Sequence, residues 1–200
     1  GTCVLYYNGK PCLIDIGREQ YVAKTFSSRR HEIWTMQSQY HNLPKINGYD
    51  QKEGGQFKAK NSSFKSDSKK VVFSTDIAGA YVLETGIEKW IRRYQLDRGR
   101  KFVVSDEYQF RELKTEPTTL NFVTYCSVSQ VSDGVLNLEG EDFKLEMIYN
   151  TKKVSPEIEF YEVDDTMLKR YWPKGITRIV FTLSDPGIKG KNQIDIVKVK

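Results

Sequence analysis

Histidine and cysteine are both scarce in this chain of 200 residues, and their scarcity argues against several kinds of site. The two histidines, His31 and His41, leave little room for a hydrolase triad, and neither stands at a spacing typical of one. The three cysteines, Cys3, Cys12 and Cys126, form no Cys-x-x-Cys pair, which argues against a redox motif and a cysteine-rich zinc site. We therefore expect all three cysteines to be small buried apolar residues.

Long apolar runs and sequence motifs for nucleotide or nucleic-acid binding are also missing. The longest apolar run, Cys3 to Tyr7, is far below the ~20 residues of a membrane helix, and no secretion signal is visible. Composition predicts a soluble chain and leaves its compartment open. The formal charge of +5 is spread over the chain, so we expect mostly solvated surface, with attraction to an acidic polysaccharide as the functional alternative. We expect no nucleic-acid partner and no membrane partner.

What the chain has in abundance is period-two alternation interrupted by turn residues. The stretch TCVLYYNGKPCLID places two apolar runs around Asn8-Gly9, a strong hairpin signal. With a two-residue turn, Cys12 would face Leu5 and Cys3 would face Ile14, so that the two sulfurs are diagonal neighbours in a poor geometry for a disulfide.

A second predicted hairpin begins with Trp90, Arg92, Tyr94 and Leu96 on one face of its first strand. Further alternating segments continue to the C-terminus, and helical periodicity is almost absent. The pattern predicts an all-β fold, a large antiparallel two-sheet β-sandwich, with residues 1–200 forming a single domain. The polar stretch from Glu53 to Lys70 is expected to be a long exposed loop or a ragged edge hairpin.

Asp15 and His41 are the residues whose chemistry raises a functional question. Asp15 ends a predicted strand just before Gly17, and His41 follows it by 26 residues. Aspartate and histidine are good ligands for zinc, although a zinc site usually needs three or four protein ligands. On spacing alone, a turn-capping aspartate and an ordinary histidine explain the two residues better. His31, which follows two arginines, is expected at the surface or at a strand edge.

Several ordered elements resemble the start of the β-sandwich domain of heparinase II/III-like polysaccharide lyases. The family pattern has a strand that begins with Gly-Ser or Gly-Thr, a hairpin that ends in hydrophobic-Asp-x-Gly, a His-Asn pair after a small or aromatic residue, and an Asn/Asp-Gly turn followed by Gln. The elements that match it are Gly1-Thr2, Leu13 to Gly17, Tyr40-His41-Asn42, and Asn47-Gly48 with Gln51.

The resemblance implies a role in cleaving uronate-containing acidic polysaccharides by β-elimination. In this reaction a base removes the proton next to the carboxylate, an acid protonates the leaving oxygen, and the developing charge must be neutralised. The family implies that an N-terminal helical toroid domain supplies the catalytic groups. No catalytic residue is therefore expected in this chain, which looks like a fragment that is inactive without that domain.

Carried onto this sequence, the resemblance places Asp15 and His41 at metal-ligand positions. It implies zinc, or another divalent metal, held weakly because the third ligand of the family lies before Gly1. The partners implied are an acidic polysaccharide and the helical domain, and the family implies a periplasmic or secreted bacterial enzyme.

Two other functions stay open at the level of sequence. One is a non-catalytic carbohydrate-binding module in which exposed tryptophans stack on sugar rings. Against it, Trp90 alternates like a core residue, and Trp172-Pro173 looks like a plug at a strand end. The other is a purely structural sandwich with no ligand.

Overall fold

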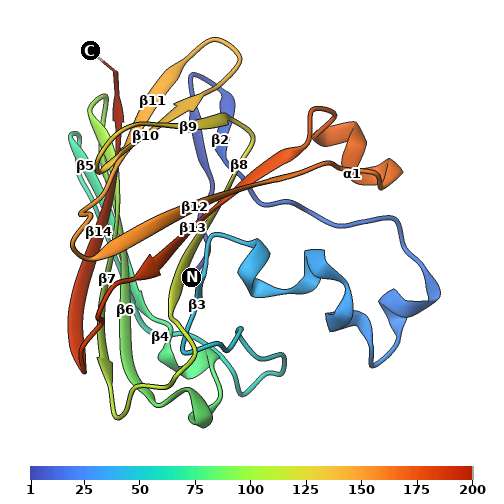
Figure 1. The fold of residues 1–200 in the computed structure, drawn as a ribbon, viewed down its shortest axis with the longest axis vertical. Helices are drawn as coiled ribbons and strands as arrows, with labels where there is room; N and C mark the ends of the chain where they lie inside the picture. The colour runs from blue at the N-terminus through green and yellow to red at the C-terminus, as the bar shows by residue number, and fades with distance from the viewer. Residues whose placement is uncertain (200) are drawn as a thin grey trace.

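The structure of this protein is a computed structural model that describes residues 1–199 as two antiparallel β-sheets packed face to face (Figure 1). In spatial order, the first sheet contains β1 (Leu5–Tyr7), β2 (Lys10–Leu13), β8 (Thr119–Thr124), β13 (Ile176–Leu183) and β12 (Val154–Tyr161), and β3 (Pro44–Lys45) also pairs with β8. The second sheet contains β4 (Lys60–Ser66), β5 (Lys70–Asp76), β6 (Ile87–Asp97), β7 (Lys101–Phe110), β14 (Lys189–Lys198), β11 (Lys144–Ile148), β10 (Val135–Glu139) and β9 (Ser127–Ser132). The predicted two-sheet sandwich is confirmed.

The first hairpin forms where the sequence predicts it, with one change of register. Asn8 and Gly9 both adopt positive φ angles, +50° and +77°, as a two-residue turn between twisted strands requires. A β-bulge then shifts the pairing, so that Leu5 lies opposite Leu13. The prediction that Cys12 faces Leu5 is therefore wrong, because the bulge adds one residue to one strand, and periodicity alone cannot locate such a residue.

The main core fills the space between the sheets. Trp90 and Tyr94 alternate along β6 and face inward, and Val104 and Tyr108 do the same on β7. Each large side chain removed from water in this way contributes roughly 1.5–3 kcal/mol. Cys12 and Cys126 are buried here as free thiols and Cys3 is partly buried, in agreement with the expected apolar role.

A second, smaller apolar cluster covers the outer face of the first sheet. It contains Ile14, Ile16, Val123, Val163, Leu168 and Ile176. Because β8 and β13 are covered on both faces, their residues are buried almost throughout.

The cover over this second cluster consists of short helices rather than strands. Residues 17–43 form an arm with four 3₁₀ helices, η1 (Ala23–Phe26), η2 (Arg30–Glu32), η3 (Trp34–Met36) and η4 (Ser38–Tyr40), drawn in blue beside the sheets in Figure 1. The single α-helix among the described residues is α1 (Thr166–Tyr171), whose N-cap Asp165 accepts hydrogen bonds from two backbone N–H groups. Trp172 therefore ends a helix, and its expected place at a strand end is wrong.

The polar stretch around residues 53–70 forms an edge of the second sheet. Residues 60–66 are β4, an exposed edge strand with two lysines, and it pairs with β5. Lysines on an edge strand oppose pairing with other chains. Two further 3₁₀ helices, η5 (Ala78–Ala80) and η6 (Leu83–Thr85), lead from β5 into β6. Across residues 1–199, none of the helices has the length and the apolar character needed to cross a membrane.

Candidate functional site

Asp15 and His41 meet on the outer side of the first sheet. Asp15 follows β2, and its Oδ1 accepts a hydrogen bond from the backbone N–H of Gly17 at 2.9 Å. Gly17 has a φ of +80°, so the chain turns sharply there and leaves Oδ2 free. His41 follows η4, and its Nδ1 lies 3.2 Å from Asp15 Oδ2. The two side chains therefore converge, as the metal-site prediction requires, and metal binding itself stays a prediction.

The other nitrogen of His41 identifies where the ring carries a proton. Nε2 lies 3.1 Å from the backbone carbonyl oxygen of Thr35, which can only accept a hydrogen bond. Nε2 therefore carries a hydrogen, and Nδ1 faces the carboxylate of Asp15. A neutral ring would then direct a lone pair at a carboxylate oxygen. A proton or a cation between the two atoms removes that repulsion.

The shifts in pKa have the same cause. Burial opposes protonation of His41, but the hydrogen bond and the charge of Asp15 outweigh burial and raise the pKa of the imidazole above its usual value. The hydrogen bond from His41 lowers the pKa of Asp15, and the N–H of Gly17 adds to this effect against the cost of burial. When His41 is protonated, the two residues form an ion pair.

The same geometry fits part of a metal site. A histidine that binds a metal through one nitrogen generally donates the other N–H to a carbonyl or a carboxylate, as His41 does to Thr35. The hydroxyl of Thr35 is buried and has no partner among the described residues, so one polar atom next to this contact remains unpaired. Within residues 1–199, however, no group of three histidine, cysteine or acidic side chains converges. Asp15 and His41 can therefore be two ligands of a site that needs at least one more.

Asn42 holds this pair in place. Its side-chain amide donates to the carbonyl oxygens of Cys3 and Ile14 at 2.7 and 2.8 Å, and its Oδ1 accepts from the N–H of Val123 at 2.7 Å. Asn42 adjoins His41 in the chain, and Ile14 adjoins Asp15. One buried amide therefore sets the separation between the two candidate ligands.

A buried ion pair in the second sheet holds the backbone of Asn42 by a hydrogen bond. Arg92 of β6 makes two hydrogen bonds of 2.8 Å with Asp106 of β7, and its remaining Nη1 donates to the carbonyl oxygen of Asn42 at 2.8 Å. Trp90 donates its indole N–H to Asp106 at 2.6 Å. Burial opposes the charge on Arg92, but the negative charge of Asp106 holds the arginine pKa above its usual value. This buried charge is satisfied on every side.

An aromatic cluster lies on the same face of the first sheet. The rings of Trp34, Tyr40 and Tyr161 have centroids 5.2–5.8 Å apart, and Tyr40 is perpendicular to the other two. The guanidinium of Arg178 lies 4.8 Å from the centre of the Tyr40 ring. The three rings line a pocket of about 270 Å³ whose other walls include Glu19 and three acidic side chains of residues 162–165. A partly exposed aromatic surface of this kind suits contact with a sugar ring.

The arm of residues 17–43 also carries basic and exposed aromatic side chains. Arg18 stacks on Tyr21 at 3.9 Å, and Phe26 at the tip of the arm is 78% exposed. Glu32 pairs with both Lys24 and Arg29 at 2.9 Å. One carboxylate pairs with two cations, so this group of three side chains carries a net positive charge.

His31, Trp90 and Trp172, which the sequence also singled out, lie outside this site. His31 is exposed on η2, in agreement with the expected surface position. Trp90 is fully buried, and Trp172 packs against Tyr125 and donates its indole N–H to the carbonyl oxygen of Ile16 at 3.0 Å. Neither tryptophan is free to stack on a sugar as the alternative function requires. The aromatic cluster with Trp34 supplies the exposed surface instead.

Comparison with solved structures identifies the fold. Heparan sulfate lyase HepC from Pedobacter heparinus superposes with a TM-score of 0.73 over 98% of this chain at 14% identity. A heparinase III structure superposes with a TM-score of 0.71 over 100% of this chain at 16% identity. The chain spans about 30% of the length of these lyases. The predicted resemblance to the sandwich of heparinase II/III-like lyases is therefore confirmed for the fold. No family model and no curated protein matches the sequence.

Proposed function

We propose that this chain is the sandwich part of a polysaccharide lyase that cleaves uronate-containing acidic polysaccharides by β-elimination. The observation that carries the proposal is the contact between Asp15 and His41 on a sandwich with the fold of two lyases of this kind. The arm beside that contact carries an excess of basic side chains, which complement a chain of sugars that carry negative charge. The partly exposed aromatic pocket next to the arm is itself lined by four acidic side chains, so the basic groups of the arm rather than the pocket would contact the carboxylates.

The role of the chain in such a reaction is to bind and orient the substrate rather than to transfer protons. β-elimination needs a base, an acid and positive charge near the uronate carboxylate. We assign no catalytic residue to this chain. Arg18 and the other cations of the arm supply positive charge, and the partly exposed ring of Trp34 supplies an aromatic surface for the sugars. These groups form one wall of the proposed cleft.

Asp15 Oδ2 and His41 Nδ1 are the atoms that would hold a zinc ion or another divalent metal. Bound there, the metal would supply a fixed positive charge beside the cleft. A third ligand would come from outside these 200 residues, so we expect the chain alone to bind zinc weakly.

An N-terminal helical domain of a longer protein is the proposed partner. It would supply the catalytic groups and the opposite wall of the cleft. By the same analogy the protein acts in the periplasm or outside a bacterial cell.

Activity measured with and without the helical domain tests this division of roles. We expect no ultraviolet absorbance from unsaturated uronate when the 200-residue chain is mixed with heparan sulfate. The longer protein should produce it. Robust turnover by the chain alone would overturn the proposal.

A non-catalytic carbohydrate-binding module is the second candidate, and the exposed cluster around Trp34 is the observation that favours it. Affinity electrophoresis on heparin, alginate and a neutral glucan separates the two. Tight binding of the isolated chain to a polysaccharide, together with no activity in the longer protein, would favour the module.

A further inference from the structure

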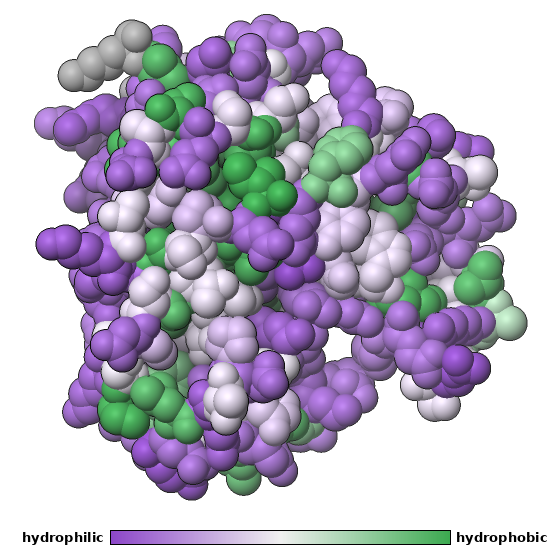
Figure 2. All heavy atoms as spheres, in the orientation of Figure 1, coloured by the Kyte–Doolittle hydropathy of each residue, from purple (hydrophilic) through white to green (hydrophobic). Residues whose placement is uncertain are grey.

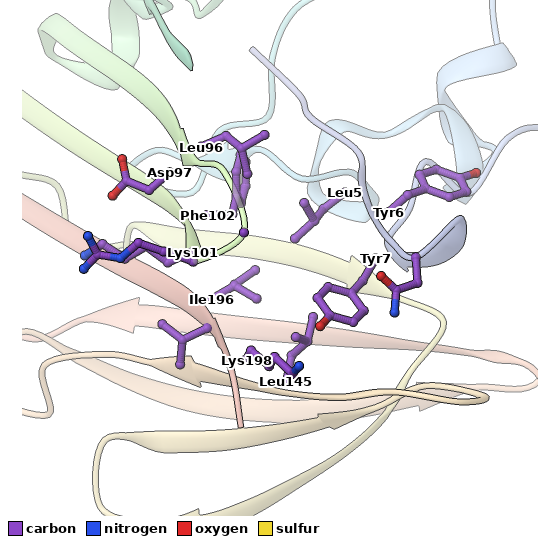
Figure 3. Close-up of a pocket in the computed structure, with 14 residues that line it drawn as sticks. Leu5, Tyr6, Tyr7, Leu96, Asp97, Lys101, Phe102, Leu145, Ile196 and Lys198 are labelled. Carbon is purple, nitrogen blue, oxygen red and sulfur yellow. The ribbon is translucent and has the colours of Figure 1, made fainter. Parts of the chain in front are cut away.

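A second cavity opens at one end of the sandwich and shares no residue with the Asp15–His41 site. Its volume is about 260 Å³, and it lies between β1 of the first sheet and four strands of the second, β6, β7, β11 and β14. Figure 3 shows its apolar side chains reaching into the space from both sheets. Those labelled are Leu5, Tyr7, Leu96, Phe102, Leu145 and Ile196. The two sheets therefore leave part of the core open to solvent here.

Some of the polar groups at the mouth of this cavity have hydrogen-bond or ion-pair partners, and others have none. Asp97 accepts a hydrogen bond from Gln95 at 3.0 Å and lies 3.7 Å from the ammonium of Lys70. Lys101 is paired with Asp195 at 2.7 Å, and in Figure 3 its side chain points away from the cavity, as that of Asp97 does. The carboxylate that lines the mouth thus already has one cation, Lys70, and one amide as partners outside the cavity.

Three other groups at the mouth have no hydrogen-bond or ion-pair partner for their side chains within residues 1–199, namely Lys198, the hydroxyl of Tyr7 and the guanidinium of Arg100. Lys198 lines the cavity next to Leu145, and no carboxylate pairs with its ammonium within residues 1–199. The hydroxyl of Tyr7 also lacks a hydrogen-bond partner among these residues, although its ring packs on Phe143 with centroids 5.3 Å apart. Figure 3 places the two side chains on the same side of the cavity. An unpaired ammonium and a free hydroxyl beside an apolar space are complementary to an anion with an apolar body.

The shape and lining of the cavity favour a small molecule over a protein partner. On the face drawn in Figure 2, the molecule is largely hydrophilic, with separate apolar spots rather than one broad apolar area. A broad apolar face would favour another protein, whereas a concave apolar space with a few polar groups is typical of a small-molecule site. The volume lies just below the ~300 Å³ at which most such pockets begin, so the ligand must be small.

We propose that this cavity binds a small aromatic carboxylate. The ring enters between Tyr7 and Phe102 above Ile196, and the carboxylate accepts hydrogen bonds from Lys198 and from the hydroxyl of Tyr7. An aromatic body is favoured over an aliphatic one because two of the walls are aromatic rings.

Nuclear magnetic resonance titration of the whole chain with 4-methylbenzoate tests the proposal. We expect saturable shifts of the backbone amides of residues 5–8 and 99–102. Binding of 4-methylbenzamide, which has the same shape and no charge, should be weaker by up to about fivefold, the difference expected for one exposed charge pair. Hexanoate, which has the charge and no ring, should also bind more weakly.

Two variants separate the site from nonspecific attraction to a positively charged protein. Lys198→Ala should weaken 4-methylbenzoate binding by the same factor, because the side chain is exposed and its loss leaves the fold intact. Lys189→Ala, at the other end of β14 and outside the cavity, should leave binding unchanged. Equal effects of the two substitutions, equal binding of acid and amide, or shifts that do not saturate would each overturn the proposal.

Discussion

Replacement of Asn42 by alanine should destabilise the protein more than almost any other single polar substitution. The side chain is 1% exposed and makes three hydrogen bonds, to the carbonyl oxygens of Cys3 and Ile14 and from the N–H of Val123. A buried polar group left without its partner costs about 1–3 kcal/mol. Allowing for some rearrangement, the loss should be about 3–6 kcal/mol, a large part of the ~5–15 kcal/mol that stabilises a typical domain.

The measurement is urea unfolding followed by tryptophan fluorescence, with two further variants. Asn42→Asp keeps the shape but turns a carboxylate oxygen toward the carbonyl oxygens of Cys3 and Ile14, so it should destabilise at least as much as alanine. Gln193→Ala removes an exposed amide on β14 and should change stability by less than about 0.5 kcal/mol. If Asn42→Asp proves as stable as the parent chain, packing rather than hydrogen bonding fixes this residue, and the reasoning is wrong.

Three further predictions concern the site itself. The raised pKa of His41 adds stability below about pH 6.5 that is lost as pH rises through the folded value, and the lowered pKa of Asp15 adds stability above about pH 3.8 that is lost below it. Urea unfolding should thus show a loss of stability above about pH 6.5 that His41→Gln diminishes and His31→Gln preserves. Zinc should bind weakly by calorimetry, and Asp15→Ala should remove it; one firmly held equivalent that survives this change contradicts the ligand assignment. Arg18→Ala should lower the salt needed to elute the chain from heparin, and an unchanged elution would remove the arm from the cleft wall.

The sequence predicts the sheets well because the strands carry their own signals. Asn8-Gly9 specifies a hairpin locally, and the alternation of Trp90 with Tyr94 identifies the face of β6 that is buried. The arm of residues 17–43 was not predicted, because 3₁₀ helices of three or four residues have no periodicity that can be recognised. Its apolar residues show neither a strand period nor a helix period, and packing on the outer face of the first sheet decides its conformation.

The buried pair of Arg92 and Asp106 could have been found in the sequence. Arg92 lies between two inward-facing aromatic residues on β6, so its side chain must also point inward. A buried arginine needs an acidic partner, and Asp106 has the same inward alternation on the neighbouring strand. The bond from this arginine to the carbonyl oxygen of Asn42 could not have been predicted, since it joins a strand to an arm whose conformation the sequence leaves open.

The contact between Asp15 and His41 is therefore positioned by a chain of hydrogen bonds that begins in the core. Asp106 neutralises Arg92, Arg92 holds the backbone of Asn42, and the amide of Asn42 fixes both the end of β2 and the segment after η4. A carboxylate and an imidazole that are half-exposed or less would not otherwise stay within 3.2 Å, because an exposed ion pair contributes only about 0–1 kcal/mol. A buried ion pair such as Arg92–Asp106 is often no more stabilising than apolar residues of similar volume, so stability alone explains this arrangement weakly. The proposed metal site would need such an arrangement, because its two candidate ligands would have to be held in place for a third.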